Sequence, residues 1–256
     1  MVAAGAGGTL RDLIRESLTI AGWVAMRRPK QSFLYDWSPH LRLGKIYRKL
    51  GHMPAANRNK LTRILIALCA AAWIVAAIDP LDRQAWLLEN LLLVLFALIL
   101  FLARERLQFS TSSHVFISLF ILIHIIGTHY TYSQMPLGLW ARDAFHLTRN
   151  PYDRVAHGAF GFLLVFPVRE LLLRFAGITK SAGYWLPPAV VLALSATFEI
   201  LESIVAEAVA PGEGVNWLGG QADEWDAQND MLIAFVGAVA MMCAVASCER
   251  SRKVRA

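Results

Sequence analysis

Six long apolar runs dominate the hydrophobic pattern of this chain. Each is close to the length of about 20 residues that a helix needs to cross a bilayer. Backbone N–H and C=O groups in hydrocarbon must be paired within their own segment, so these runs predict transmembrane helices. The sequence therefore predicts an all-α fold, a polytopic membrane bundle with spans at residues 61–79, 85–103, 112–131, 155–175, 184–208 and 230–248.

The first sixty residues have a different pattern. Apolar positions between Thr9 and Met26 recur with the helical period and alternate with charged residues, as in an amphipathic helix. Such a helix either lies on the membrane surface or packs on cytoplasmic loops. Nearly all charged residues in segment 27–60 are lysine or arginine. Such a basic segment is a topology signal and also suits anionic lipid headgroups. The first long apolar run starts only near Leu61, so we expect no cleavable secretory leader.

These patterns divide the chain into three parts. Residues 1–60 are expected to form a basic cytoplasmic extension, residues 61–248 the transmembrane domain, and residues 249–256 a basic cytoplasmic tail. The composition agrees with a lipid-embedded chain, because only 17% of residues are charged and 56% are hydrophobic. The net charge of +6 accompanies no recognised nucleic-acid-binding module, so we expect membrane lipid and no nucleic acid as a partner.

The distribution of basic residues in the loops predicts the orientation. One set of loops, together with both terminal segments, carries more lysine and arginine than the opposite set. Such loops usually face the cytoplasm, so both termini are predicted to be cytoplasmic in a bacterial inner membrane. Loops 132–154 and 209–229 are then extracytoplasmic. Arg169 and Glu170 interrupt the fourth run, and they either snorkel toward the cytoplasmic headgroups or mark a shorter helix.

In this topology a set of acidic and histidine residues lies on the extracytoplasmic side, whereas His114 lies at the cytoplasmic end and His124 in the middle of the third span. Three pairs are spaced three or four residues apart, and each pair therefore shares one helical face. These pairs are Asp153 with His157, Glu199 with Glu202, and Asp226 with Asp230. The same side carries further polar residues that would support such a cluster: Glu89, His129, His146, Arg149, Arg154 and Asp223.

Charge on this side is unbalanced. Only Arg142, Arg149 and Arg154 are available to neutralise the acids, so protonation, a bound cation or exposure to water must do the rest. From position 143 to position 230 on this side we count ten acids: Asp143, Asp153, Glu199, Glu202, Glu207, Glu213, Asp223, Glu224, Asp226 and Asp230.

Three interpretations of the cluster remain open at this point. In the first, a divalent ion such as zinc, iron or manganese is held by nitrogen and oxygen ligands. Its candidate ligands are His146, His157, Glu199, Glu202, Asp226 and Asp230, with His129 as another histidine. In the second, arginines clamp the acids in a structural network. In the third, the acids form a protonatable relay. We expect His157, Glu199, Glu202 and Asp226 or Asp230 to converge.

The motifs resemble those of a known family. The segments H-Y-T-Y (129–132), M-P-L-G-L-W (135–140), F-H-L-T-R-N-P-Y-D-R-V-A-H-G-A-F-G-F (145–162), R-E-L-L-L-R (169–174), F-E-I-L-E (198–202) and Q-A-D-E-W-D-A-Q-N-D-M (221–231) are similar to the bacterial inner-membrane YjdF family. This resemblance implies a polytopic inner-membrane protein and supplies no reaction.

A second resemblance covers fewer positions. The order D-R-x-x-H (153–157), E-x-x-E (199–202) and D-x-x-x-D (226–230) is similar to VanZ-like membrane proteins, which are linked to glycopeptide tolerance. In those proteins we expect glutamine where this chain has Glu202.

Three function classes follow from these observations. The first is a membrane-embedded enzyme that acts on a lipid-linked or envelope substrate, with His157, Glu199, Glu202 and Asp230 as catalytic candidates. The second is a transporter or proton-coupled carrier. The third is a non-catalytic membrane scaffold. Against the transporter, the sequence has no evident inverted repeat or broken-helix pair.

Overall fold

A computed structural model describes residues 55–209, 221 and 223–253 of the chain. The expected interfacial helix of the basic extension lies outside these residues. The described part is all-helical and has no strand, which confirms the predicted fold class. Its helices are α3 (Ala55–Ala76), α4 (Arg83–Leu107), α5 (Thr111–His129), α6 (Pro136–Ala144), α7 (Tyr152–Phe175), α8 (Ala182–Val209) and α9 (Asp226–Lys253).

Six of these helices are long and apolar enough to cross a membrane, and α6 is the short exception. They coincide with the six apolar runs and extend several of them by a few residues. The fourth run does not stop at its charged pair, because α7 continues through Arg169 and Glu170 to Phe175. A shorter helix, one of the two interpretations of that pair, is therefore wrong.

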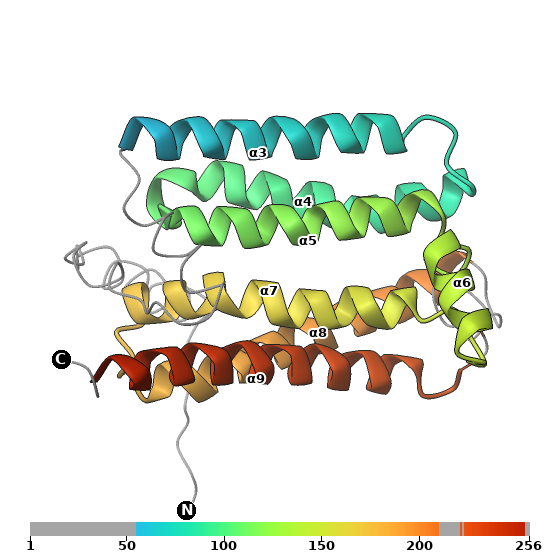
Figure 1. Ribbon diagram of the computed structural model, residues 1–256. Helices are drawn as coiled ribbons and strands as arrows, with labels where there is room; N and C mark the ends of the chain where they lie inside the picture. Colours follow the sequence, from blue (N-terminus) through green and yellow to red (C-terminus); the bar gives the residue numbers. More distant parts are fainter. Residues whose placement is uncertain (1–54, 210–220, 222, 254–256) are drawn as a thin grey trace, which may run out of the picture.

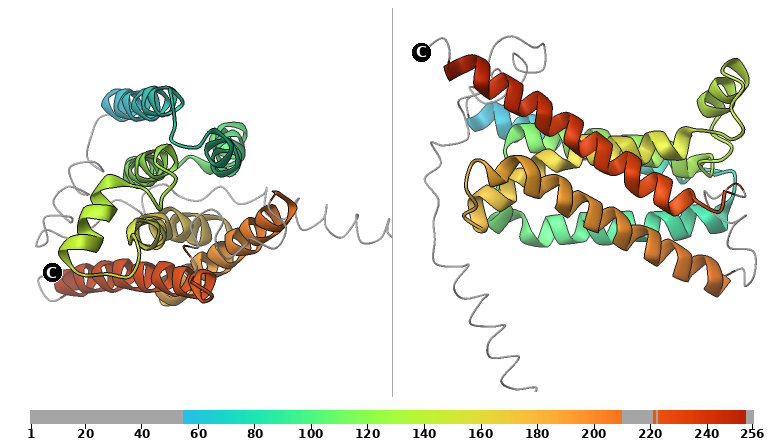
Figure 2. Two further views of the ribbon diagram at one scale, coloured as in Figure 1. Left: turned by 90° about the vertical axis from the view of Figure 1, so that its right-hand side faces the viewer. Right: turned by 90° about the horizontal axis from the view of Figure 1, so that it is seen from below.

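The helix α7 lies at the centre of the bundle. It packs against α5, α8 and α9, whereas α3 and α4 pack against α5 (Figure 1). The six long helices run roughly along one axis, and α6 lies across one end of the bundle. Viewed along that axis, α3 and α4 lie at its outer edge (Figure 2). Their outer faces expose apolar side chains such as Ile66 and Leu102, as expected for helices that contact lipid.

Glycines allow α7 and α9 to approach closely. A Cβ atom added to Gly161 would lie 1.8 Å from the carbonyl oxygen of Ala234, and one on Gly237 would lie 2.4 Å from that of Gly158. Small residues at such a crossing let two backbones touch in a membrane bundle. This contact places the start of α9 beside the start of α7, where the acidic motifs lie.

An apolar core lies between the two ends of the bundle. Val165 of α7, Val191 of α8 and Ala238 of α9 are fully buried, and Met241 and Val245 continue the same core. This core separates the two ends of the bundle from one another.

The far end of α7 carries a buried polar network. Glu170 is 3% exposed and accepts hydrogen bonds from the backbone N–H of Ser110 at 2.9 Å and from its hydroxyl at 2.8 Å. The hydroxyl of Ser113 and the guanidinium of Arg174 also donate to this carboxylate. Glu170 therefore does not snorkel: it binds the N-terminus of α5 and is neutralised by an arginine one turn away.

Candidate functional site

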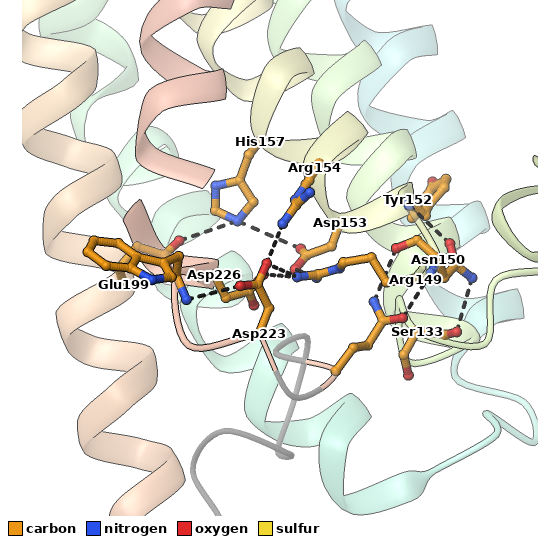
Figure 3. Close-up of polar contacts among 12 residues, drawn as sticks. Ser133, Arg149, Asn150, Tyr152, Asp153, Arg154, His157, Glu199, Asp223 and Asp226 are labelled. Atoms are coloured by element: carbon orange, nitrogen blue, oxygen red, sulfur yellow. Dashed lines mark hydrogen bonds and ion pairs between the residues drawn. The ribbon is translucent and has the colours of Figure 1, made fainter. Parts of the chain in front are cut away.

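The opposite end of α7 brings together polar residues from three helices and two loops (Figure 3). Asp153 and His157 come from the first two turns of α7, Glu199 from α8, and Asp226 and Asp230 from the first two turns of α9. Each pair shares a helical face because of its spacing of three or four residues. The glycine-mediated crossing of α7 and α9 then brings these faces together.

One half of the cluster is an arginine network. Arg149 forms ion pairs with Asp226, with Asp223 at 3.3 Å and with Asp153 at 3.7 Å. Arg154 pairs with Asp223 as well. In this half of the cluster each carboxylate therefore has a cationic partner.

The charges of this half are set by its contacts. The backbone N–H of Trp225 donates to Asp223, and together with Arg154 and Arg149 it holds the pKa of this carboxyl below its usual value. Burial lowers the pKa of Arg149, but the hydrogen bond to Asp226 and the nearby negative charges outweigh it, so the net shift is upward. Both groups are therefore ionised at neutral pH.

The other half of the cluster has a histidine at its centre. The Nε2 atom of His157 lies 3.4 Å from Oε1 of Glu199 and 3.7 Å from Oδ1 of Asp153. The imidazole also stands edge-on to the ring of Phe198, with centroids 5.8 Å apart. His157 is thus positioned by α8 as well as by its own helix.

Asp230 completes this half. Asp153, His157 and Asp230 each offer one ligand atom, and these atoms lie within 4.8 Å of one another. Asp230 is 1% exposed, and its Oδ1 atom has no hydrogen-bond partner among the described residues. The Oε1 atom of Glu199 is buried and also lacks a hydrogen bond, because its approach to His157 has ion-pair distance without hydrogen-bond geometry. In the described part of the chain neither oxygen accepts a hydrogen bond, and both carboxylates lie near His157, which is an arrangement that a cation would satisfy.

Glu202 and Glu89 adjoin the cluster. Glu202 is half-buried in α8, one turn beyond Glu199, and Glu89 of α4 lies within electrostatic range of Glu202 and of Asp153. An oxygen of Glu89 is buried without a hydrogen-bond partner in the described part of the chain. The acidic character therefore extends from α9 across α7 and α8 to α4.

Tyr132 joins this region from the loop after α5. Its hydroxyl lies 2.7 Å from Nδ1 of His124, a mid-span histidine. Burial, followed by the charges of Glu89 and Asp153, raises the pKa of Tyr132 well above its usual value. The tyrosine therefore remains protonated and can donate a hydrogen bond.

Asn150 lies next to the site, in the loop before α7, and is absent from the sequence-based candidates. Its backbone N–H donates to Oε1 of Gln221 at 2.9 Å, and its C=O accepts from the Nε2 of Gln221 at 3.1 Å. Its side-chain amide donates to the carbonyl oxygens of Ser133 and Met135. Asn150 thus joins three loops and positions its neighbour Arg149. The sequence signals Asn150-Pro151 only as a helix stop, and nothing in the local pattern signals Gln221 as its partner.

Two histidines named from the sequence lie apart from the cluster. His146 is exposed in the loop after α6, and within the described residues no hydrogen bond or ion pair joins it to the other candidates. His129 instead connects α5 to the end of α3, through Nδ1 at 3.0 Å from the carbonyl oxygen of Ala76. Its backbone carbonyl accepts from the N–H of Leu81. His146 therefore lies in a loop and His129 at the end of α5, both apart from the clustered carboxylates.

Comparisons with known proteins agree with the helical architecture. The model of a family described as "Predicted membrane protein (DUF2238)" matches residues 61–251, which is most of the chain and contains every residue of the cluster. The chain belongs to the DUF2238 family. A DUF2238 relative, the inner membrane protein YjdF of Escherichia coli (strain K12), is 31% identical over 185 residues. That match covers 72% of this chain and 85% of the relative. No solved structure was found to match the chain.

The family assignment and the YjdF relative confirm the expected resemblance to the YjdF family. The assignment establishes a membrane protein with six helices of spanning length and leaves the chemistry to be inferred from the site.

Proposed function

We propose that Asp153, His157 and Asp230 bind a divalent metal ion, and that this DUF2238 protein is a metal-dependent membrane enzyme. One observation carries the proposal: three ligand atoms converge within 4.8 Å, and a fully buried oxygen of Asp230 has no hydrogen-bond partner among the described residues. A buried carboxylate in this state is costly unless a proton or a cation compensates it.

The ligand set suits a borderline metal. One imidazole nitrogen with carboxylate oxygens is typical of zinc, iron or manganese sites. Glu199 is the nearest further carboxylate, since it already lies 3.4 Å from Nε2 of His157. We assign Glu199 as the fourth ligand. Asp226 belongs to the arginine network and acts by positioning Arg149.

A purely structural network accounts for only half of the cluster. The arginines reach Asp153, Asp223 and Asp226, and these pairs need no metal. Asp230 and Glu199 form no ion pair with an arginine among the described residues, and the Nε2 atom of His157 lies 3.4 Å from Glu199. The metal proposal accounts for these two buried carboxylates, each of which has an oxygen without a hydrogen bond in the described part of the chain.

The chemistry would be that of an activated water. A bound divalent ion lowers the pKa of a coordinated water and polarises a substrate oxygen. Glu202, one turn beyond Glu199, is our candidate for the carboxylate that accepts the proton. Because the site lies near the end of the bundle, we infer a lipid-linked or envelope substrate that approaches within the membrane or at its surface.

The proposal includes the topology. The first and last spanning helices, α3 and α9, begin and end at the bundle end opposite the cluster (Figure 1). The basic loops favour a cytoplasmic location for that end. We therefore propose that both termini are cytoplasmic and that the cluster faces the extracytoplasmic side. Reporter fusions after Arg255 and within residues 212–216 test this orientation, and an external C-terminus would refute it.

A transporter is less well supported. A carrier needs polar groups along the whole path, whereas the apolar core of Val165, Val191 and Ala238 lies between the two ends of the bundle. At the far end, Glu170 is fully engaged with Ser110, Ser113 and Arg174. These contacts favour a site at one end over a path between two ends.

Metal analysis of the purified full chain tests the proposal. After loading with zinc, manganese or ferrous iron and removal of excess, the wild type should retain stoichiometric metal, measured by elemental analysis. His157→Ala and Asp230→Asn should lose it. Asp143→Asn, which alters an exposed acid whose ion pair among the described residues is with Arg142, is the matched control and should retain it. Chelation should lower the thermal unfolding temperature of the wild type and of the control, but not that of the two site variants.

A second measurement addresses the enzyme. Protein in vesicles is incubated with envelope lipid extract, and the lipids are followed by mass spectrometry. A lipid consumed by the wild type should persist with Glu202→Gln, which keeps its metal. A wild type that binds no metal, with site variants that are merely less stable, would establish the scaffold instead.

A further inference from the structure

The short helix α6 carries an apolar face that the rest of the chain does not cover. Leu137 and Trp140 are each 61% exposed, and Phe145, just after the helix, is 67% exposed. The rings of Trp140 and Phe145 meet edge to face with centroids 6.3 Å apart, so they form one continuous surface. We name Leu137, Trp140 and Phe145 the α6 apolar face.

The opposite face of α6 is fixed to the bundle. Gly138 is buried, and a Cβ atom there would lie 1.8 Å from Oδ1 of Asn150. Asn150 also donates to the carbonyl oxygens of Ser133 and Met135, directly before the helix. Because these contacts determine which side of α6 turns outward, the exposure of the α6 apolar face is built into the fold.

The direction of α6 suits a membrane surface. The helix lies across the end of the bundle, roughly perpendicular to the six long helices (Figure 1), and it lies at the periphery of that end (Figure 2). When those helices span a bilayer, α6 lies parallel to the membrane plane. At the end of the spans and at the periphery of the bundle, α6 would lie at the boundary between lipid headgroups and acyl chains.

Two further tryptophans are exposed at the ends of the bundle. Trp225, just before α9 at this end, is exposed, and Trp185, near the start of α8 at the other end, is exposed as well. Exposed tryptophans at both ends of a membrane bundle typically lie at the two interfaces. Arg142 and Asp143 form an exposed ion pair at the end of α6.

We propose that α6 is an interfacial helix whose apolar face inserts into the lipid leaflet on the side of the acidic cluster. Amphipathic helices of this kind bury an apolar face at the headgroup boundary and leave their charges in water. The insertion holds Asn150, and through it Arg149, at a constant depth beside the cluster. This inference depends on the spans and on the exposure of α6, and it is independent of whether a metal binds.

Site-directed spin labelling tests the insertion. The three native cysteines are first replaced by alanine, and Leu137→Cys, Asp143→Cys and Leu102→Cys are each introduced into the full chain. The labelled proteins are placed in vesicles of phosphatidylethanolamine and phosphatidylglycerol that contain a water-soluble nickel complex on both sides. Collision of the label with oxygen, which is concentrated in lipid, is compared with collision with the nickel complex. Leu102, exposed on the outer face of α4, is the lipid reference.

The label at position 137 should favour oxygen several-fold, like the label at position 102, whereas the label at position 143 should favour the nickel complex. All three positions are exposed, so each variant is expected to fold, and gel filtration checks this. A label at 137 that behaves like the one at 143 would refute the insertion. A label at 137 that is immobilised and reached by neither reagent would also refute it and would indicate a second protein surface on α6.

Discussion

Buried carboxylates at the two ends of α7 differ in whether their oxygens have hydrogen-bond partners. At the far end, Glu170 has a donor for each oxygen and an arginine, Arg174, one turn away. At the near end, Asp230 and Glu199 are also buried, and each has an oxygen without a hydrogen bond in the described residues. The polar network at one end of α7 therefore has all its hydrogen bonds, whereas the network at the other end lacks some of them.

The difference separates a structural role from a functional one. A buried ion pair with all its hydrogen bonds made is a fixed part of the fold, because breaking it leaves a charge uncompensated. A buried carboxylate that lacks a donor costs stability and persists where a ligand or a proton compensates it. Four experiments break or sharpen this contrast.

The largest effect is expected from Glu170→Ala. Its removal leaves Arg174 and the N–H of Ser110 without their carboxylate, so the free energy of unfolding should fall by about 3–5 kcal/mol. Reversible unfolding in mixed detergent micelles measures it. Glu170→Gln, which keeps the acceptor oxygen, should lose less. Wild-type stability in Glu170→Ala would remove the contrast from the far end.

Asp230→Asn should have the opposite sign in chelated protein. It removes a buried charge whose Oδ1 atom has no hydrogen-bond partner in the described residues, so the unfolding free energy should rise by about 1 kcal/mol. The same unfolding titration, with a chelator present throughout, measures the change. A loss as large as that of Glu170→Ala would mean that both ends are equally structural.

The arginine half should respond to pH through Asp223. Its folded pKa lies below the ordinary value, so ionised Asp223 stabilises the fold above about pH 3.9, the pKa of an unperturbed aspartate. This stabilisation is lost as the pH falls through the lower, folded pKa. The difference in unfolding free energy between wild type and Asp223→Asn should therefore be constant near neutral pH and disappear in acid. A difference that grows with acidity would contradict the assigned shift.

The smallest effect is expected from Asp143→Asn. Its ion pair with Arg142 is exposed, and such pairs rarely contribute more than about 0.5 kcal/mol. Unfolding and metal content should both match the wild type. A clear loss of either would mean that the exposed loop contributes to the site.

The long helices were predictable because hydrocarbon imposes a strong constraint on length and composition. The sharing of faces by Asp153 with His157, and by Asp226 with Asp230, followed from helical spacing alone. The contact partner of Glu170 did not follow, because spacing places a residue on a face without saying which helix lies opposite. The contact between Asn150 and Gln221 joins two loops 71 positions apart through backbone groups, which carry no periodic signal. The exposed position of His146 did not follow from the sequence either, because this residue lies in an irregular loop and has a positive φ.

The contact between Gly161 and Ala234 has a consequence for the choice of ion. Asp153 and His157 lie on α7 and Asp230 lies on α9, and these two backbones touch about one turn beyond the nearest of these residues. The spacing of the proposed ligands is thus set by two main chains in contact, and flexible side chains adjust it little. Glu199 comes from α8, which diverges from this pair (Figure 2). The fixed distance between α7 and α9 would therefore select the bound ion by its radius. A methyl group added at Gly237 would increase the distance between these two helices without altering any ligand.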